Sequence, residues 1–122
     1  MADASITPSV NLMTCRILHS AADAITLRPL DPAQVLDGQP AAGVVEFSVT
    51  GIDCGLWEHT PGISTDVEAD EVFVVISGRA RIEVQGGPVL DVGPGDVVQL
   101  EAGNPTTWTV TETLRKLWVT PS

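Results

Sequence analysis

"DEVFVVISGRARIEV", residues 70–84, is the stretch of sequence that decides the fold class of this chain. Residues 71–77 are apolar on both faces of a strand, which is typical of a central strand with side chains packed on each side. Residues 79–84 alternate between charged and apolar side chains, which is typical of a strand with one exposed face. By the same alternation, Glu71 points the same way as Phe73. An acid therefore lies at the mouth of the interior that this face of the strand lines.

Strand signals recur outward from this stretch, separated by turn residues. The chain has 11 Gly and 9 Pro, which is many for its length, and turns at short intervals indicate an all-β design. Gly86 and Gly87 indicate a tight hairpin, because paired positive φ angles suit glycine. Asp31 and Pro32 indicate a short helical turn that ends at Leu36, with Asp31 as its N-cap. We expect about eight short strands in a sandwich or barrel, at residues 44–50, 54–60, 71–77, 79–84, 88–92, 97–100, 106–111 and 114–120.

The whole chain has 122 residues, which suits one domain, and its 43% hydrophobic content is that of a globular protein. Its 16 Asp and Glu against 6 Lys and Arg give a formal net charge of −10, so we expect neither nucleic acid nor an anionic membrane surface as a partner. No apolar run approaches the ~20 residues of a membrane span, and the first residues lack the pattern of a signal peptide. We therefore expect a cytoplasmic protein.

The two cysteines, Cys15 and Cys54, lie far apart in the sequence and form no CxxC motif. One pair of cysteines is no disulfide framework. Reduced thiols are the favoured interpretation in a cytosolic protein, with a single disulfide as the alternative.

Two motifs in the second half of the chain resemble those of the cupin superfamily. "EVFVVISG", residues 71–78, has the form E-x6-G, and "GDVVQLEAG", residues 95–103, follows it. The fuller pattern, over roughly residues 30–120, resembles the cupin subfamily that includes (S)-ureidoglycine aminohydrolase and the ethanolamine-utilisation cupin. Its matching positions, in order, are Trp57, Glu58, Pro61, Gly62, Asp70, Glu71, Gly78, Gly95, Asp96, Gly103, Trp108, Arg115 and Lys116.

This resemblance implies an all-β cupin fold, a double-stranded β-helix or jelly-roll-like barrel that is open at one end and has its site inside. It implies a cupin barrel over residues 30–122, preceded by a short irregular N-terminal arm or edge segment over residues 1–29. It also implies a homodimer, since small cupins commonly pair through sheet edges and pairing removes an exposed edge.

The resemblance also allows a test for the metal site of many cupins. Metal-binding cupins take ligands from H-x-H-x3-4-E-x6-G and from a histidine in the second motif, because residues i and i+2 of a strand point the same way and neutral imidazole binds divalent metals. In this sequence the histidine position of the second motif falls on Thr106, and neither histidine position of the first motif holds a histidine. Glu71 is therefore the one residue that remains at a ligand position. One carboxylate does not hold a transition metal, so we expect no metal and no cofactor. The first two histidine positions fall on other residues in either spacing: Thr65 and Val67, or Ser64 and Asp66.

A cluster of acids comes just before the central strand: Asp66, Glu68, Asp70 and Glu71. Oxygen-rich clusters hold Ca²⁺ or Mg²⁺ in some proteins. Strand alternation, however, puts the first three of these acids on one face and Glu71 on the other. We interpret the cluster as a solvated approach to the strand. Metal binding through substitute ligands, namely His59, Asp66 or Glu68, is the alternative.

Three residues are candidates for acid–base chemistry in the barrel: Glu71, His59 and Lys116. His59 comes just before the turn at Pro61-Gly62, on a strand that we expect beside that of Glu71. A His–carboxylate pair there acts as a general base, while a hydrogen-bonded structural histidine is the alternative. Of Arg115 and Lys116 at most one points inward, to bind a ligand carboxylate or to pair with Glu71; a surface salt bridge is the alternative.

The expected ligand-binding residues are Trp57, Phe73, Thr106, Trp108 and Arg115. Thr106 and Trp108 share a strand face, so Trp108 lines the barrel if Thr106 does. A tryptophan in that position forms the floor of a pocket for an apolar or planar ligand, or else it fills a small barrel.

Taken together, the residues favour a small-molecule-binding cupin of unassigned ligand that lacks the usual transition-metal site. The alternative is a small-molecule enzyme, with aminohydrolase-like or other acid–base chemistry, that uses Glu71 in the barrel. A structural role in assembly has no specific support in the sequence. The expected partners are a small-molecule ligand and a second copy of the chain.

Overall fold

The structure is a computed structural model that describes residues 15–21 and 23–121. The outer part of the expected N-terminal arm, residues 1–14, lies outside the described residues. Within them the chain forms nine strands and one short 3₁₀ helix, η1 (Pro32–Gln34), so the expected all-β fold is confirmed. The strands are β1 (Arg28–Pro29), β2 (Val35–Asp37), β3 (Ala41–Val49), β4 (Ile52–His59), β5 (Gly62–Val67), β6 (Glu71–Val84), β7 (Val89–Val92), β8 (Val97–Leu100) and β9 (Pro105–Thr120).

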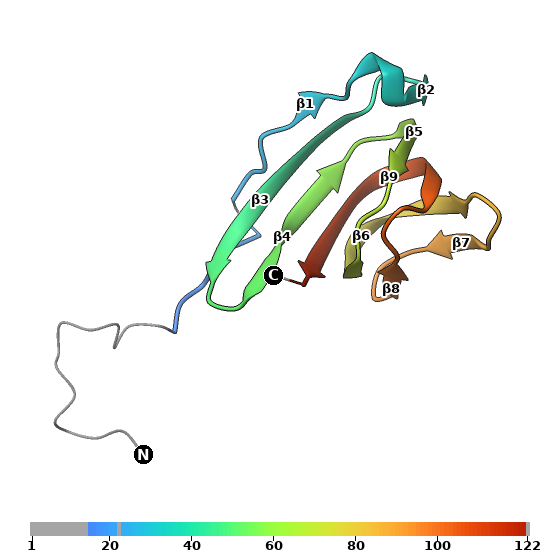
Figure 1. Cartoon of the computed structure of the whole chain (residues 1–122). Coiled ribbons are helices and arrows are strands. Elements are labelled where there is room, and N and C mark those ends of the chain that lie inside the picture. Colours follow the sequence, from blue (N-terminus) through green and yellow to red (C-terminus); the bar gives the residue numbers. More distant parts are fainter. Residues whose placement is uncertain (1–14, 22, 122) are drawn as a thin grey trace, which may run out of the picture.

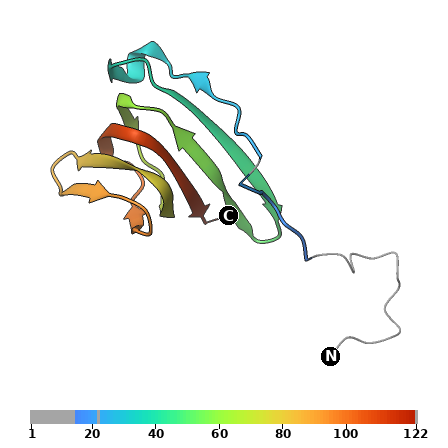
Figure 2. The same ribbon diagram turned by 180° about the vertical axis from the view of Figure 1, so that it is seen from behind.

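Two long strands, β6 and β9, pair antiparallel and lie at the centre of the sheet (Figure 1). Residues 72–77 of β6 pair with residues 115–119 of β9, and residues 79–84 pair with residues 106–112. The register shifts between these two halves, around Gly78. Both strands therefore bend, and the sheet curls round on itself, as the view from behind also shows (Figure 2).

Gly78 is the residue that permits the bend. Its φ is +90°, and a Cβ placed on it would lie 2.1 Å from the carbonyl oxygen of Thr113 in β9. The close approach of the two backbones therefore admits only glycine. This is the glycine of the E-x6-G motif. The two strands expected at residues 71–77 and 79–84 are in fact one bent strand, and β9 likewise unites the two strands expected at the C-terminal end.

The other strands are arranged around β9. Its second half pairs with β4, which pairs with β3 and then β1, whereas its first half pairs with β5, which pairs with β2. Beside β6 lie β8 along its first half and β7 along its second. The curled sheet thus has two walls that the bent strands β6 and β9 join, which is the architecture of the expected jelly-roll-like barrel (Figures 1 and 2).

The core lies inside the curl, on one face of these strands. Its buried side chains come mainly from alternate positions of β6 and β9, as the period of two along a strand requires. Each large apolar side chain buried in this way stabilises the fold by about 1.5–3 kcal/mol. The buried cluster consists of Phe73, Val75, Ala80, Ile82, Val92, Val98, Leu100, Trp108, Val110 and Leu114.

Two short elements differ from the expectations. The helical turn begins as expected at Pro32, and Asp31 Oδ1 accepts a hydrogen bond from the Ala33 N–H at 3.0 Å, but the turn ends at Gln34 because β2 follows at once. Strand β5 was not among the expected strands, since "GISTDV" is short and mostly polar. It is a strand because β9 on one side and β2 on the other both pair with it.

The described part of the N-terminal segment, residues 15–21 and 23–27, forms neither helix nor strand. It packs closely against β3 near its end, since a Cβ on Gly43 would lie 2.0 Å from the carbonyl oxygen of Thr26. β1 also lies within the expected arm and pairs with β3. The boundary between an arm and a barrel at residue 30 stays a prediction.

Two further observations concern expectations from composition. Cys15 and Cys54 are both free thiols. Among the helices of the described residues, none has the length and apolar character needed to cross a membrane.

Candidate ligand-binding cavity

A cavity of about 330 Å³ opens inside the curl of the sheet, between strands β4, β5, β6 and β9. Three of its lining residues are the candidates for acid–base chemistry, Glu71, His59 and Lys116. Two aromatic candidates, Trp57 and Trp108, line it as well. The remaining lining residues are Leu30, Gln34, Val44, Ser64, Thr65, Asp66, Glu68, Trp118 and Thr120.

Lys116 projects into this cavity and forms an ion pair with Glu71, with 2.6 Å between Nζ and Oε2. Its ammonium also lies over three aromatic rings, 4.6 Å from the ring centre of Trp57, 4.4 Å from that of Phe73 and 5.0 Å from that of Trp108. Rings at these distances attract a cation through their negative faces. One carboxylate and three rings therefore hold the ammonium in place. The structure thus selects Lys116, out of the pair Arg115 and Lys116, as the inward residue.

Arg115 points to the opposite face of β9. Its guanidinium lies 2.8 Å from Glu58 Oε1, and Glu58 is the residue of β4 directly across from it. The expected contact of Arg115 with a ligand therefore does not apply to this cavity. Successive residues of a strand face opposite ways, so the inward position of Lys116 excludes Arg115.

Glu68 also reaches the cavity, and here the interpretation of a solvated acidic approach is wrong. Its Oε2 accepts a hydrogen bond from the Thr106 hydroxyl at 2.6 Å and another from the indole N–H of Trp108 at 2.9 Å. Strand β5 ends at Val67, so strand alternation no longer governs Glu68. Its backbone instead pairs with the loop before β9, through bonds to Asn104 and Gly103. Glu68 and Glu71 therefore line one cavity, although alternation predicted opposite faces.

The charge of Glu68 has no cationic partner. In the described residues the ion pairs of the structure join other side chains, and both bonds to Oε2 come from neutral donors. The second oxygen, Oε1, has no hydrogen bond to a described residue. A half-buried carboxylate with one free oxygen is thus exposed to whatever occupies the cavity.

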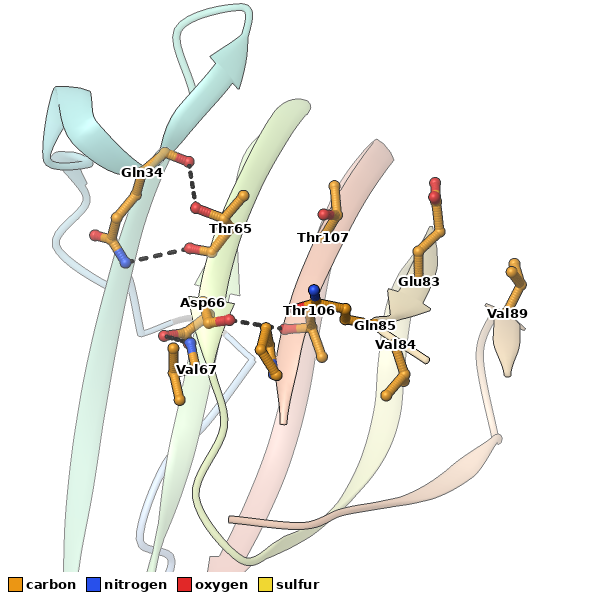
Figure 3. Close-up of a pocket in the computed structure, with 11 residues that line it drawn as sticks. Gln34, Thr65, Asp66, Val67, Glu83, Val84, Gln85, Val89, Thr106 and Thr107 are labelled. Atoms are coloured by element: carbon orange, nitrogen blue, oxygen red, sulfur yellow. Dashed lines mark hydrogen bonds between the residues drawn. The ribbon is translucent and has the colours of Figure 1, made fainter. Parts of the chain in front are cut away.

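The register of β5 decides which spacing of the metal motif applies. Ser64 pairs with Trp108 and Asp66 pairs with Thr106 across the β5–β9 ladder, so these residues face the cavity. Thr65 touches the edge of the cavity, but its hydroxyl is directed at η1, where it donates to the Gln34 carbonyl at 3.4 Å, as Figure 3 shows. Two hydroxyls and a carboxylate therefore stand where the metal-binding pattern has histidines. The described residues contain no group of three or more His, Cys, Asp or Glu side chains placed to hold a metal ion.

His59 is almost completely buried and makes two hydrogen bonds. Its Nδ1 lies 2.6 Å from the carbonyl oxygen of Thr60, and its Nε2 lies 2.9 Å from the hydroxyl oxygen of Ser64. Because a carbonyl only accepts, Nδ1 carries the proton. Burial lowers the pKa of His59 and the nearby charge of Lys116 lowers it further, against the opposing effect of the Thr60 bond. A neutral imidazole therefore accepts the Ser64 O–H at Nε2.

This arrangement differs from the expected meeting of His59 with Glu71. No hydrogen bond joins these two side chains in the part of the chain that the structure describes. Glu71 accepts a hydrogen bond from Lys116 instead, and His59 accepts one from Ser64. The Trp57 ring lies between the two pairs, since its centre is 5.2 Å from that of His59 and 4.6 Å from the Lys116 ammonium. The sequence pointed to Ser64 only as a position where the cupin metal motif has a histidine and this chain does not. Its bond to His59 depends on how the turn at Pro61-Gly62 places β5, which no local pattern reveals.

Two expected ligand contacts, Phe73 and Thr106, lie just behind the cavity wall. Phe73 touches the Lys116 ammonium, and Thr106 holds Glu68 in position. A larger hollow of about 770 Å³ lies next to the cavity and shares Gln34, Thr65 and Asp66 with it (Figure 3). Outward-facing residues such as Glu83 line that hollow, and none of the buried charged groups does. The smaller cavity is therefore the better candidate site.

Comparisons with known proteins agree with this fold. The family model of the EutQ-like cupin domain matches residues 49–118. The EutQ protein of Clostridium difficile is 19% identical over 76% of this chain and 75% of its own, with a TM-score of 0.62. Ectoine synthase from P. lautus is 17% identical over 75% of this chain and 66% of its own, with a TM-score of 0.58.

A protein of unknown function from Pseudomonas syringae pv. tomato str. DC3000 is 26% identical over 80% of this chain, with a TM-score of 0.66, and the match covers 44% of that protein. A comparison with curated proteins found no match. The likeness to the EutQ protein and to ectoine synthase, at below 25% identity, shows the fold alone.

Proposed function

The chain belongs to the family of EutQ-like cupin domains, and on this premise we propose that it binds a small molecule in the cavity of its barrel. We propose further that the ligand presents an amino group to Glu68. The observation that carries this proposal is the Glu68 carboxylate, which lies in a cavity of about 330 Å³ with two neutral donors on Oε2 and no cation beside it.

The charges of the cavity support an amino group. Asp66, Glu68 and Glu71 line it with one cation, Lys116, which the Glu71 carboxylate already holds. Withdrawing a carboxylate from water is costly unless a hydrogen-bonded partner replaces the water. An ammonium group provides such a partner, since its hydrogen bonds to a carboxylate are charge-assisted and about twice as strong as neutral ones. The rings of Trp57 and Trp118 line the same cavity and suit the apolar part of a small amine.

The proposal is tested by thermal shift with matched probes. Propylamine and benzylamine are compared with propanol and benzyl alcohol, which have the same apolar part and no amino group. A ligand that prefers the folded state raises Tm, so the amines are expected to raise it in a saturable way. Glu68→Gln removes this rise, while Glu101→Gln, at an exposed acid, retains it. An equal rise in the Glu68→Gln variant would reject the assigned role of Glu68.

A second candidate function is acid–base catalysis on a small molecule. The observation that favours it is the short contact of Lys116 with Glu71 inside the cavity. In this version Glu71 exchanges a proton with the substrate, and Lys116 and His59 assist by charge and hydrogen bonding. Aminohydrolase-like chemistry is one reaction of this class. Assays on ureido and amino-acid substrates compare the wild type with Glu71→Gln, and an activity that this change leaves intact removes Glu71 from the mechanism.

We also propose the homodimer that the sequence resemblance implies and a location in the cytoplasm. The outer face of β4, β6 and β9 supports the dimer, because it exposes apolar side chains that a second copy would cover: Ile52 at 43%, Ile76 at 48% and Val119 at 42%. Light scattering after size-exclusion chromatography gives the molar mass. A mass of one chain at micromolar concentration rejects the dimer.

A further inference from the structure

We propose that Ser64 and His59 form a nucleophile–base pair that gives the cavity acyl-transfer activity towards small activated esters. This reaction goes beyond ligand binding and gives a role to Ser64, which otherwise only stands at a histidine position of the cupin metal motif. It rests on the proposed function in one respect, because the ester has to enter the same cavity.

The geometry is that of an activated hydroxyl. Ser64 Oγ lies 2.9 Å from His59 Nε2, within the range that a base needs to take the hydroxyl proton. A third group orients the base, as nucleophile–base pairs require. That group is the Thr60 carbonyl oxygen, which accepts from Nδ1–H at 2.6 Å. It fixes the tautomer with a lone pair on Nε2, the role that a carboxylate has in a Ser-His-Asp triad.

Burial keeps the pair in its reactive form. His59 is 1% exposed and Ser64 is 6% exposed. The lowered pKa of His59 keeps the imidazole neutral, and thus able to accept a proton, at neutral pH. Burial lowers the local dielectric constant, so their hydrogen bond is stronger than one at the surface.

The surroundings of the pair suit an acyl substrate. Both side chains line the cavity, so a carbonyl carbon can reach Ser64 from it. Four charged groups share the cavity with His59: Lys116 from β9, Glu71 from β6, Asp66 from β5 and Glu68 from the turn after β5. Lys116 is the cation among them, and its charge already acts on His59. A fixed positive charge stabilises the oxyanion that forms when a hydroxyl attacks an ester.

The proposed reaction needs no reagent other than the ester and water. Ser64 Oγ attacks the ester carbonyl carbon, and its proton passes to His59 Nε2. The bond from the carbonyl carbon to the leaving oxygen breaks, and the leaving alcohol takes the proton from His59. Water then attacks the acyl-Ser64 ester with His59 as base, which releases a carboxylic acid and restores the Ser64 hydroxyl. No oxidation or reduction occurs.

The test uses p-nitrophenyl acetate with the full-length protein. After a short incubation the reaction is stopped with acid, and peptide fragmentation locates any acetyl group. The expected result is an acetyl group on Ser64, formed together with nitrophenol. Its rate rises with pH as His59 loses its proton and then levels off, at a lower pH than it would with an ordinary histidine, because burial lowers the pKa of His59. His59→Gln is expected to slow the reaction at Ser64 roughly 100-fold, the usual contribution of a general base. Ser77→Ala, the removal of an exposed serine hydroxyl on β6, is expected to leave it unchanged.

Three results overturn the inference. The first is a wild-type protein that responds to amines in the thermal shift but carries no acetyl group on Ser64. The second is a folded His59→Gln variant that acetylates Ser64 at the wild-type rate. The third needs no variant: a rate at Ser64 that keeps rising in proportion to hydroxide excludes His59 as the base. Acetylation of Ser64 without any amine response rejects the proposed ligand class and supports the pair.

Discussion

Lys116 and Glu71 form an ion pair inside the barrel, with 2.6 Å between Nζ and Oε2. The two side chains are only 7% and 16% exposed, and they join β9 to β6. A buried ion pair adds little net stability over apolar packing, but the loss of one partner leaves a charge buried and unpaired. The pair is therefore a point at which a single substitution is expected to have a large effect.

Replacement of Glu71 by Gln is expected to lower the free energy of unfolding by about 3 kcal/mol, at the lower end of the range for broken buried pairs. The lower end applies because three aromatic rings still contact the Lys116 ammonium. Urea denaturation with linear extrapolation measures the change. Glu83→Gln makes the same exchange at an exposed position of β6 and is expected to stay within about 0.5 kcal/mol. Equal stability of the two variants would contradict this account of the pair.

Gly78→Ala is expected to destabilise the fold by more than about 3 kcal/mol, because strain at positive φ adds to a clash with the backbone. The added Cβ would lie 2.1 Å from the Thr113 carbonyl oxygen. Gly86→Ala is the matched control, since Gly86 also has a positive φ, +73°, but nothing lies within 4 Å of its added Cβ. The free energy of unfolding of that variant is expected to fall by about 1–2 kcal/mol, the cost of backbone strain alone. Thermal or urea unfolding of both variants compares them, and similar losses would show that the approach of β9 is unimportant.

Much of the barrel follows from local patterns in the sequence. A strand has a period of two, so the sequence alone places Phe73 with Val75, and both are 1% exposed. The same rule places Thr106 with Trp108, which are 3% and 4% exposed. Orientation within one strand is a local property, and local patterns predict it.

The parts that the sequence does not reveal depend on contacts between distant segments. Strand alternation allows one inward residue at positions 115 and 116, and it is Lys116 because β9 continues from Pro105 to Thr120 without the break that the sequence predicts, so that Lys116 shares a face with Trp108. Glu68 was predicted on the face opposite to Glu71, but β5 ends at Val67 and the chain beyond it places both acids in one cavity. Ser64 meets His59 only through the turn that separates β4 from β5. Each of these misses concerns where a strand ends or bends.

The free energy of unfolding is expected to fall as the pH drops below 6.5, because of His59. Its pKa is lowered in the folded protein, chiefly by burial, from the ordinary 6.5. As the pH falls through 6.5, the unfolded chain therefore binds a proton on His59 before the folded protein does, and this favours unfolding. More than about one pH unit above 6.5, His59 is neutral in both states, and its contribution is constant.

Urea unfolding at a series of pH values between about 5 and 8 measures this loss, above the range in which most carboxylates titrate. His59→Gln is expected to remove the loss, and His19→Gln is expected to keep it. A loss of the same size in the His59→Gln variant would assign the pH dependence to another group.

Removal of metals is expected to have no effect on the protein. Ser64 and Thr106 stand at histidine positions of the cupin metal motif, and hydroxyls are weak ligands for transition metals. Elemental analysis of the purified protein is expected to find far less than one Mn, Fe, Ni or Zn per chain, and dialysis against EDTA is expected to leave Tm unchanged. A metal bound in equal number to the chains, with a lower Tm after EDTA, would show that substitute ligands such as Asp66 or Glu68 hold a metal.

Thr106→Val is expected to weaken both the fold and the binding of amines, because the Thr106 hydroxyl holds Glu68 Oε2 at 2.6 Å. The substitution keeps the shape of the side chain and removes one donor to a charged group, which costs about 1.5–3 kcal/mol of unfolding free energy. Thr107→Val is the matched control on the same strand, since alternation turns residue 107 away from Glu68. Urea unfolding and the thermal shift with benzylamine are measured on both variants. Glu68 keeps its bond to the Trp108 indole, so the amine response of Thr106→Val is reduced and not abolished. If Thr106→Val matches Thr107→Val in both measurements, then the Thr106 hydroxyl does not position Glu68 for a ligand.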